Sequence, residues 1–414
     1  MKRRVPFVKK ILYFLPIVII LFLLVSCGAE PKKEPPKMQE KIIGSETYHG
    51  AIEMPSRILF VRFGGMWYYS KADGASEVFC FNPLCSHSVQ ETACIYRLFN
   101  PSPKAGVVEY SEKENRVYMA RGQKIYSTSF DASDLRLDCS LGEIGDINKR
   151  ESGNYIRWMR CTDNYLFFLY RNDKTGHTQL MRYDTSKRKL EAISSENEWI
   201  IGYEPTETYI FAKILTENNE LQYVTTDFDF ENRHIVNNPI DPSSTGVSMG
   251  VFDGKYFYGR IPEGLFALNP LTDEKKLISD SDLIDGSQVL AVHNGFIYFT
   301  STERKVVGKK YDSRLDDYRD VETGECKLYR ASQNGEINLA LDFISPIETL
   351  NFVDGGAVIY TGSIYDANGN NMNSQRGPIS IYYDLDESGN LINPKIVGNC
   401  ADDAELIEYL KGLS

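Results

Sequence analysis

The sequence lacks the short motifs that identify many classes of enzyme. It has no H-E-x-x-H pair of metal ligands, no phosphate-binding P-loop and no G-x-G-x-x-G loop. The Asp box of sialidases, S-x-D-x-G-x-T-W, is also absent, which counts against a glycosidase of that type. No Cys-x-x-Cys spacing occurs, so redox catalysis by such a pair is unsupported. The sequence therefore gives no catalytic signature on which an activity could be based.

One nucleophile motif is matched, but in the wrong context. Residues 246–250 fit G-x-S-x-G, with Ser248 in the position of the nucleophile. An α/β-hydrolase places this motif between a strand and a helix. Here it leads into VFDGKYFYG, which has the pattern of a hairpin strand. We therefore assign no catalytic role to Ser248.

The remaining polar candidates are weaker. The runs DANGNN (366–371) and DLDESG (384–389) resemble the start of a calcium loop, but both lack the glutamate at position 12. We expect them to be polar hairpin tips. Four histidines lie far apart in the sequence, and we expect them at surface or turn positions: His49, His177, His234 and His293.

The sequence is also short of positive charge. It has 46 Lys and Arg residues against 57 Asp and Glu, a formal charge of −11, and five of the basic residues lie among the first 26. Nonspecific nucleic-acid binding depends on basic side chains that neutralise phosphates, so we expect no nucleic-acid partner. With 42% hydrophobic and 12% aromatic residues, the rest of the chain has the composition of a folded globular protein.

No apolar run has the length of an ordinary membrane-spanning helix. The run Ile11–Val25 follows a basic stretch and is short of the ~20 residues that a spanning helix needs, which is typical of a signal peptide. It ends in Leu-Val-Ser-Cys, which resembles the bacterial lipobox. Residues 1–26 are therefore predicted to be a lipoprotein signal peptide and Cys27 the lipidated residue, with an uncleaved signal anchor as the alternative. Two acyl chains would hold the protein on the extracytoplasmic face of the cell membrane.

The segment after Cys27 predicts a tether. Residues 28–41 contain three prolines, abundant Lys and Glu and almost nothing apolar. Such a composition cannot bury a core, so we expect residues 27–47 to be the lipidated cysteine and a disordered linker to the folded domain.

The body of the chain repeats. From about residue 48, short aromatic and β-branched runs alternate with Gly, Asn, Asp and Lys turns, a pattern typical of strands and hairpins. A second strand, and then a third such as KRKLEAI or EKKLISD, follows most copies of the first. The copies start 40 to 61 residues apart, which is typical of a β-propeller. The recurring strand reads RILFVRF (57–63), NRVYMAR (115–121), NYLFFLY (164–170), TYIFAKI (208–214), KYFYGRI (255–261), GFIYFTS (295–301) and GAVIYTG (356–362).

These repeats predict an all-β fold, a β-propeller of seven blades over residues 48–399. Six or eight blades are alternatives, and a β-sandwich or double barrel is the structural runner-up. The tail, residues 400–414, breaks the β pattern and places its large apolar residues on one helical face, so we expect a short C-terminal helix. The insertion at 302–325 is dense in charge of both signs, and we expect a solvated loop within blade six, with a role in lining a binding face as the alternative.

The segment CFNPLCSHSVQETAC carries four potential ligands in the spacing C-x4-C-x-H-x6-C: Cys80, Cys85, His87 and Cys94. Three thiolates and an imidazole would complete a tetrahedral zinc site, although this spacing fits common zinc fingers poorly. A protein outside the cytoplasm is also in a disulfide-permissive environment. Without Cys27 seven cysteines remain, an odd number. A structural disulfide, a zinc site and reduced cysteines all stay open.

The isolated cysteines and the tryptophans are expected to be structural. Cys in a strand is usually a buried apolar residue, which is our interpretation of Cys139 and Cys161. Core packing is likewise expected for Trp67, Trp158 and Trp199, with an aromatic platform for sugars or peptides as the alternative.

The signal peptide with lipobox, the charged tether, the Cys80–Cys94 segment and the strand repeats together resemble the uncharacterised β-propeller lipoproteins of Gram-positive, clostridia-like bacteria. These are similar to low-density-lipoprotein-receptor-like and TolB-like propellers. The resemblance covers essentially the whole chain after the signal peptide. It implies a cell-surface location and a propeller fold, but no activity.

Two functions of different class follow. The first is a membrane-anchored extracytoplasmic binding or interaction module for an unknown protein, peptide or glycan, because a propeller presents loops on two rims. The second is a hydrolase or lyase acting on an envelope or extracellular polymer. Convergent carboxylates and histidines with shifted pKa values would favour the enzyme, and exposed aromatic residues with uncharged neighbours would favour the binder.

Overall fold

The computed structural model describes most of the chain from Ala51 to Val397. The described ranges are 51–62, 65–80, 84–86, 108–141, 155–172, 175–206, 208–218, 220–237, 251–284, 287–300, 304–312, 317–324, 326–343, 347, 349–353, 355–361, 379–397 and 408. The chain divides into Met1–Gln39 and Glu40–Ser414, and all described residues belong to the second unit. The expected signal peptide, lipidated Cys27 and tether lie outside the described residues.

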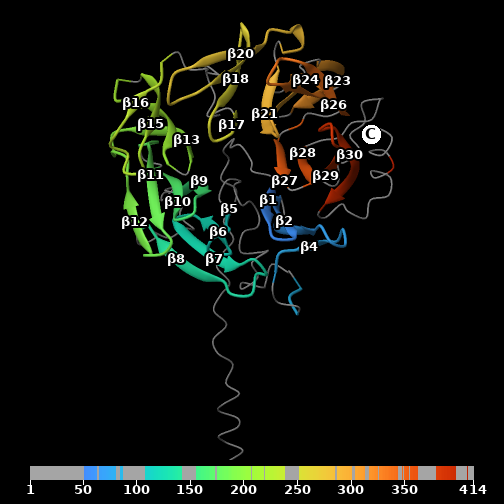
Figure 1. Cartoon of the computed structure of the whole chain (residues 1–414). Coiled ribbons are helices and arrows are strands. Elements are labelled where there is room, and N and C mark those ends of the chain that lie inside the picture. Colours follow the sequence, from blue (N-terminus) through green and yellow to red (C-terminus); the bar gives the residue numbers. More distant parts are fainter. Residues whose placement is uncertain are drawn as a thin grey trace, which may run out of the picture. The chain divides into compact units, whose positions relative to one another are not determined.

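The second unit is a seven-bladed β-propeller, as the repeats predicted (Figure 1). Each blade is a four-stranded antiparallel sheet, and its first strand in the chain is the innermost.

The first four blades follow one another along the chain. Blade one has β1 (Ala51–Met54), β2 (Arg57–Arg62), β3 (Gly65–Ser70) and β4 (Ser76–Val78). Blade two has β5 (Val108–Ser111), β6 (Arg116–Arg121), β7 (Lys124–Ser129) and β8 (Arg136–Ser140). Blade three has β9 (Tyr155–Cys161), β10 (Tyr165–Arg171), β11 (Thr178–Asp184) and β12 (Lys189–Ala192). Blade four has β13 (Trp199–Pro205), β14 (Ile210–Leu215), β15 (Leu221–Thr226) and β16 (His234–Ile235).

The last three blades complete the ring. Blade five has β17 (Val251–Phe252), β18 (Phe257–Ile261), β19 (Gly264–Leu268) and β20 (Lys275–Ser279), followed by a 3-10 turn, η1 (Asp282–Ile284). Blade six has β21 (Gln288–His293), β22 (Phe296–Thr300), β25 (Cys326–Ser332) and β26 (Ile337–Phe343). Blade seven has β27 (Thr349–Val353), β28 (Gly356–Thr361), β29 (Ile379–Leu385) and β30 (Leu391–Val397).

The apolar strand that recurs in the sequence is the second strand of every blade. In β6, for example, Val117 to Ala120 are all buried, because both faces of the sheet are covered by neighbouring blades. Most of the core clusters accordingly combine residues of adjacent blades, such as Phe167 of blade three with Ile210 of blade four. This shared burial makes the blades interdependent and explains why a single four-stranded repeat is not a stable unit.

Among the described strands, the ring closes without exchange between its first and last blades. In the described part of the chain every sheet is built from its own stretch of sequence, and no strand from the N-terminal side pairs with β30. Instead, blades one and seven share an apolar cluster in which Ile58, Phe60 and Tyr69 pack against Val358 and Tyr382. The rings of Tyr69 and Tyr382 lie 5.1 Å apart. In the described part of the chain, side-chain packing therefore joins the first and last blades.

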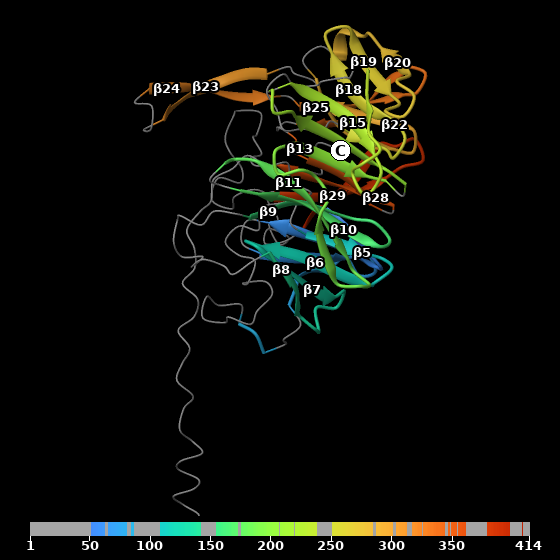
Figure 2. The same ribbon diagram turned by 90° about the vertical axis from the view of Figure 1, so that its left-hand side faces the viewer.

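The expected loop at 302–325 is wrong in part. Most of this insertion forms a two-stranded antiparallel ribbon, β23 (Arg304–Asp312) and β24 (Asp317–Gly324), which projects from blade six (Figure 2). Its position within blade six agrees with the sequence prediction. In a two-stranded ribbon the inward-facing backbone groups pair with each other and the outward-facing ones can bond to water, so a strongly charged sequence does not prevent it.

Two expectations about helices have different outcomes. Of the helix expected at 400–414 the structure describes only Glu408, so that prediction stays open. Within the described residues, no helix has the length and apolar character needed to cross a membrane.

Candidate functional site

Only part of the cysteine segment is described. Cys80 and Cys85 are half-buried at the end of blade one, whereas His87 and Cys94 lie outside the described residues, as does Ser248. Among the residues that the structure describes, no group of three or more His, Cys, Asp or Glu is placed to hold a metal ion. The zinc site and the disulfide therefore both remain predictions.

Cys139 and Cys161 fit the structural role expected from the sequence. Both are half-buried and pack against the apolar cluster between blades two and three, and neither forms a disulfide with a described residue. Burial raises the pKa of each thiol to about 12. Thiolate is the reactive form of cysteine, so neither residue is poised for catalysis.

The described histidines lie on different blades. His234 of blade four is 3.1 Å from the carboxylate of Asp273 in a turn of blade five. His293 of blade six stacks on Phe352 with ring centroids 4.3 Å apart, and burial lowers its pKa. His177 is exposed on blade three. No pair of them converges, so they do not form a catalytic or metal-binding set.

One of the two calcium-like runs is described and is a hairpin tip, as expected. Asp386 accepts hydrogen bonds from the backbone N–H of Asn390 and from its side-chain amide, both at 2.8 Å, and so closes the β29–β30 turn. The carboxylate is used to order the turn. The run at 366–371 lies outside the described residues.

The three tryptophans differ in their surroundings. Trp158 is buried, and Trp67 is half-buried beside the cluster that joins blades one and seven, so core packing is confirmed for both. Trp199 is half-buried at the start of β13 and lines a surface pocket. Its ring lies nearly parallel to that of His177, at 20° and with centroids 6.0 Å apart. For Trp199, the aromatic-platform alternative fits the geometry.

The pocket between blades three and four has a volume of about 350 Å³. It is lined by His177, Asn197, Trp199, Leu215, Thr216 and Glu217. These residues come from the β10–β11 turn, the connection from β12 to β13, and the end of β14 with the turn that follows it. Because the strands of each blade alternate in direction, all three segments meet at the same face of the propeller.

That face also carries the ribbon. The β22–β25 connection, into which β23 and β24 are inserted, corresponds in its blade to the β10–β11 turn that supplies His177. On the opposite face the strands are joined by short turns that their own polar side chains close. Thr206, for example, accepts from the backbone N–H of Tyr209 at 3.0 Å. The elaborated face is therefore the one that contains the pocket, as is common for binding sites on rigid scaffolds.

A second group of polar residues lies on the innermost strands around the propeller axis. Arg160 of β9 reaches the neighbouring blades on both sides. Its Nε and Nη2 each donate to Glu204 of β13 at 2.9 Å, and its Nη1 lies 3.3 Å from Glu109 of β5. The three side chains are 17%, 25% and 17% exposed, respectively. One cation thus links three blades and leaves the group with an excess negative charge.

The two carboxylates are not equivalent. Glu204 receives the two-pronged hydrogen bond, whereas Glu109 has a single, longer contact with Arg160. Burial raises the pKa of Glu109 to about 7, although the nearby charge of Arg160 acts in the opposite direction. A carboxyl group that gains and loses a proton near neutral pH has the property required of a general acid or base.

A β-bulge in the innermost strand positions this group. The register of β9 against β10 shifts between Phe168 and Leu169, and the extra residue, Trp158, has a positive φ of 38°. The buried hydroxyl of Tyr203, next to Glu204, lies 2.6 Å from the carbonyl of Trp158 and 2.8 Å from that of Phe167. This contact fixes blade four against the bulge of blade three and so aligns Glu204 with Arg160.

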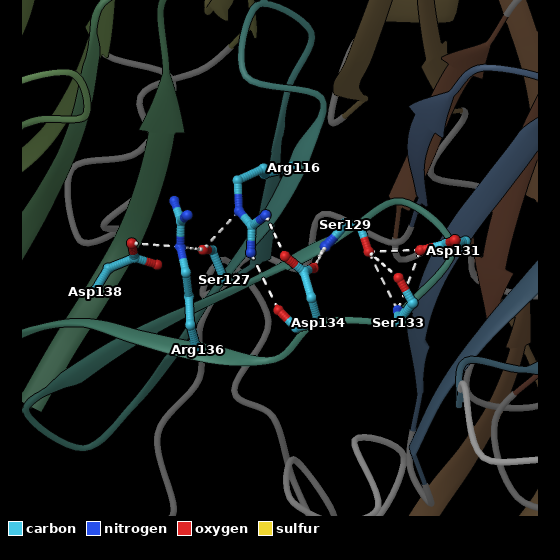
Figure 3. A network of polar contacts seen from close by, with 8 residues as sticks. All are labelled: Arg116, Ser127, Ser129, Asp131, Ser133, Asp134, Arg136 and Asp138. Carbon is cyan, nitrogen blue, oxygen red and sulfur yellow. Dashed lines mark hydrogen bonds and ion pairs between the residues drawn. The ribbon is translucent and has the colours of Figure 1, made fainter.

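A third network, in blade two, is structural (Figure 3). Arg116 donates to Ser127 at 2.9 Å and to the carboxylate of Asp134 at 2.8 Å, and Asp134 also accepts from the backbone N–H of Ser129. The hydrogen bond from Arg116 lowers the pKa of Asp134 to about 2. These contacts order the β7–β8 turn, and the Arg116 and Asp134 charges are neutralised by each other.

Sequence reasoning missed Glu109, Arg160 and Glu204 entirely. They lie on innermost strands whose mixed sequences, such as YIRWMRC, do not belong to the recurring apolar strand. The sequence did indicate where the innermost strands lie, because each of them directly precedes a copy of the recurring strand. Placing the three side chains together requires the register of three blades, which one sequence does not give.

Comparisons with known proteins identify the fold and no family. No family model matches the chain, and no curated protein matches it. The β-propeller domain of the Trilobed protease from Pyrococcus furiosus, described as having an open velcro topology, matches with a TM-score of 0.50 and 11% identity over 86% of this chain and 99% of that one. Oligogalacturonate lyase from Vibrio parahaemolyticus matches with 0.52 and 10% identity over 81% and 88%.

Puromycin hydrolase matches with a TM-score of 0.52 and 11% identity, over 87% of this chain and 55% of that one. At such low identity these similarities show the propeller fold alone. They include enzymes, but the fold hosts unrelated functions, so the function has to be argued from the residues.

Proposed function

We propose that the chain is a membrane-anchored bacterial lipoprotein whose propeller is an extracytoplasmic binding module. The observation that carries the binding function is the pocket beside Trp199. Its polar side chains at His177, Asn197 and Glu217 make no hydrogen bond or ion pair with another described residue. Polar groups that gather around a hollow without partners of their own are typical of ligand sites.

The lipobox, the basic N-terminus and the charged tether support the anchor. In this proposal Cys27 carries the acyl chains, and the chain belongs with the propeller lipoproteins of Gram-positive bacteria that its sequence resembles. Cys27→Ala in the native host tests the anchor. We expect the domain to leave the membrane fraction or to persist as an uncleaved precursor. Unchanged fractionation together with normal processing would exclude a lipid anchor.

Binding without chemical conversion is the second part of the proposal. The full chain, incubated with isolated envelope polymers, is expected to co-sediment with one of them while no new reducing ends or free amines form. Trp199→Ala should abolish the co-sedimentation. Leu271→Ala, an exposed leucine in a turn on the opposite face of blade five, serves as the matched control. Catalytic release of fragments in excess of the protein would contradict a pure binding module.

An enzyme remains the second candidate, and Glu109 is the observation that favours it. Its raised pKa and its place beside Arg160 fit a general acid or base acting on a polymer. In this case Glu109→Gln would abolish cleavage while Trp199→Ala would leave the rate at saturating substrate unchanged. If Glu109→Gln and Trp199→Ala both show the same cleavage of every polymer as the unmodified chain, this second candidate is excluded.

A further inference from the structure

The pocket beside Trp199 offers unused hydrogen-bond donors and acceptors together. The indole N–H of Trp199 is a donor, the carboxylate of Glu217 is an acceptor, and the amide of Asn197 is both. The imidazole of His177 also has one nitrogen of each kind when neutral. The backbone N–H groups of His177 and Asn197 are occupied by Thr175 and Ser195, but none of these four side chains is hydrogen-bonded to a described residue.

This mixture discriminates between classes of ligand. A cation would use only the acceptors and would leave the indole N–H and the amide N–H groups without partners. An anion would meet the carboxylate of Glu217. A sugar hydroxyl donates and accepts at once, so neighbouring hydroxyls match donors and acceptors that lie side by side. The pocket therefore fits a neutral, polyhydroxylated ligand best.

The aromatic surface has the shape that such a ligand needs. The rings of Trp199 and His177 lie within 20° of parallel. Rings that enclose a quaternary ammonium group stand at steep angles to one another, because they surround a sphere of charge. A nearly parallel, stacked pair such as this one instead leaves the outer face of each ring as a flat apolar surface. The C–H face of a pyranose ring is flat and apolar, while its edge carries the hydroxyls.

The size and position of the pocket limit what enters it. At about 350 Å³ it is at the small end of the range of about 300–1,000 Å³ found for ligand pockets. His177, Asn197 and Glu217 are all exposed, so the pocket lies at the surface. It has room for one or two sugar rings, and a longer chain could continue into solvent.

We infer that the Trp199 pocket binds one residue of a neutral glycan, with its C–H face on the indole and its hydroxyls bonded to Asn197 and Glu217. This inference rests on the proposed binding function and names the ligand class for the same site. It also makes Glu217 the residue that excludes acidic sugars.

The test uses the full chain, solubilised in a detergent without a sugar headgroup, and saturation-transfer NMR. The probes are methyl glycosides of glucose, galactose, mannose and N-acetylglucosamine, the glycoside of glucuronic acid, choline, and a neutral tripeptide. We expect at least one neutral glycoside to bind, with the strongest transfer to the protons of one ring face. Glucuronide should not bind to the unmodified chain.

Variants assign the signal to the pocket. Trp199→Ala should weaken binding at least tenfold, Trp199→Phe less, and Asn197→Ala and Glu217→Gln by several fold each. Glu217→Gln should also reduce the discrimination against glucuronide. Leu271→Ala should bind as the unmodified chain does. Thermal unfolding of each variant identifies those that are misfolded, and Asn197→Ala tests the site independently of the aromatic ring.

The outcomes separate this inference from the proposed function. If choline or the tripeptide binds in a Trp199-dependent way and no neutral glycoside does, the pocket is a binding site but the sugar inference is wrong. Glycoside binding that survives both Trp199→Ala and Asn197→Ala also overturns it. Absence of any neutral-glycoside signal overturns it as well, while co-sedimentation with an envelope polymer would still support the binding module.

Discussion

The guanidinium of Arg160 and the carboxylate of Glu204 form a two-pronged ion pair between the innermost strands of adjacent blades, with both N–O distances at 2.9 Å. Parallel hydrogen bonds of this kind fix geometry as well as charge. Arg160 also faces Glu109 in the preceding blade. The three residues therefore couple blades two, three and four near the axis.

Removal of Arg160 should be costly. Arg160→Met leaves two poorly hydrated carboxylates facing each other, and we expect the free energy of unfolding at pH 7 to fall by about 3 kcal/mol. Denaturant titration followed by tryptophan fluorescence measures it. Lys395→Met is the matched control, because Lys395 pairs with Asp384 but is 46% exposed, and such pairs contribute about 1 kcal/mol or less. Equal losses of unfolding free energy in the two variants would show that the ion pairs of Arg160 contribute no more to stability than an exposed pair.

Glu109 should make stability depend on pH in a specific direction. Its pKa rises from 4.5 to about 7 on folding, so the folded state holds a proton that the unfolded state has already lost between these values. The stability that this proton contributes is complete below pH 4.5 and is lost as the pH rises through 7. Glu109→Gln removes the titration and should gain stability relative to the unmodified chain between pH 5 and 8. A constant difference across this range would contradict the raised pKa.

The hydroxyl of Tyr203 should contribute measurably to the packing of blade four against blade three. Tyr203→Phe leaves the carbonyls of Trp158 and Phe167 without this donor, and the expected loss is about 1–2 kcal/mol. Tyr183→Phe is the control, because the buried hydroxyl of Tyr183 has no hydrogen-bond partner among the described residues and its removal should cost nothing. Comparison of the two midpoints in denaturant decides the matter.

The thiols of Cys139 and Cys161 should resist alkylation in the folded protein. Burial raises both pKa values to about 12, so almost no thiolate is present at pH 8. We expect iodoacetamide to modify these residues only after unfolding, as seen by peptide mass spectrometry. Labelling in the native state at the rate of a free thiol would show that blades two and three separate readily at their shared cluster.

The segment with Cys80, Cys85, His87 and Cys94 has its own test. For the protein purified without reductant or chelator, we expect no bound metal and at least two thiols missing from the free-thiol count, because the extracytoplasmic location that we propose would favour a disulfide. Elemental and intact-mass spectrometry measure both. Stoichiometric zinc that is lost in His87→Ala would instead establish the alternative, a Cys3His site.

The sequence predicted the propeller because one element of each repeat is nearly all apolar. Strands such as β10 and β28 are buried on both faces, so their sequences are recognisable without any structure. The innermost strands carry charged residues near the propeller axis, such as Arg160, and aromatic residues at the surface pocket, such as Trp199. Their sequences vary from blade to blade. The pocket escaped prediction for a related reason, since His177 and Glu217 come from different blades and meet through packing.

The insertion in blade six shows a different limit of prediction from sequence. Its high charge suits a solvated loop, yet its backbone forms an antiparallel ribbon in which Lys309 lies opposite Asp320 in the strand register. Backbone pairing requires only two extended segments and a turn, and hydrophobic patterning detects strands that have a core to cover. A ribbon outside the core escapes that criterion.

The apolar cluster that joins blades one and seven, the seam of the ring, determines where the propeller would open under a mechanical pull. If Cys27 is held in a bilayer and a ligand is bound, a pull on that ligand is transmitted through β1, the first described strand of the chain. Among the described residues no C-terminal strand pairs with blade one, and apolar contacts such as those of Ile58, Phe60 and Tyr69 join it to its neighbour across the seam. Such contacts yield to shear more easily than a ladder of backbone hydrogen bonds. Under tension we expect the ring to open at this seam, while the Trp199 pocket, in blades three and four, keeps its shape.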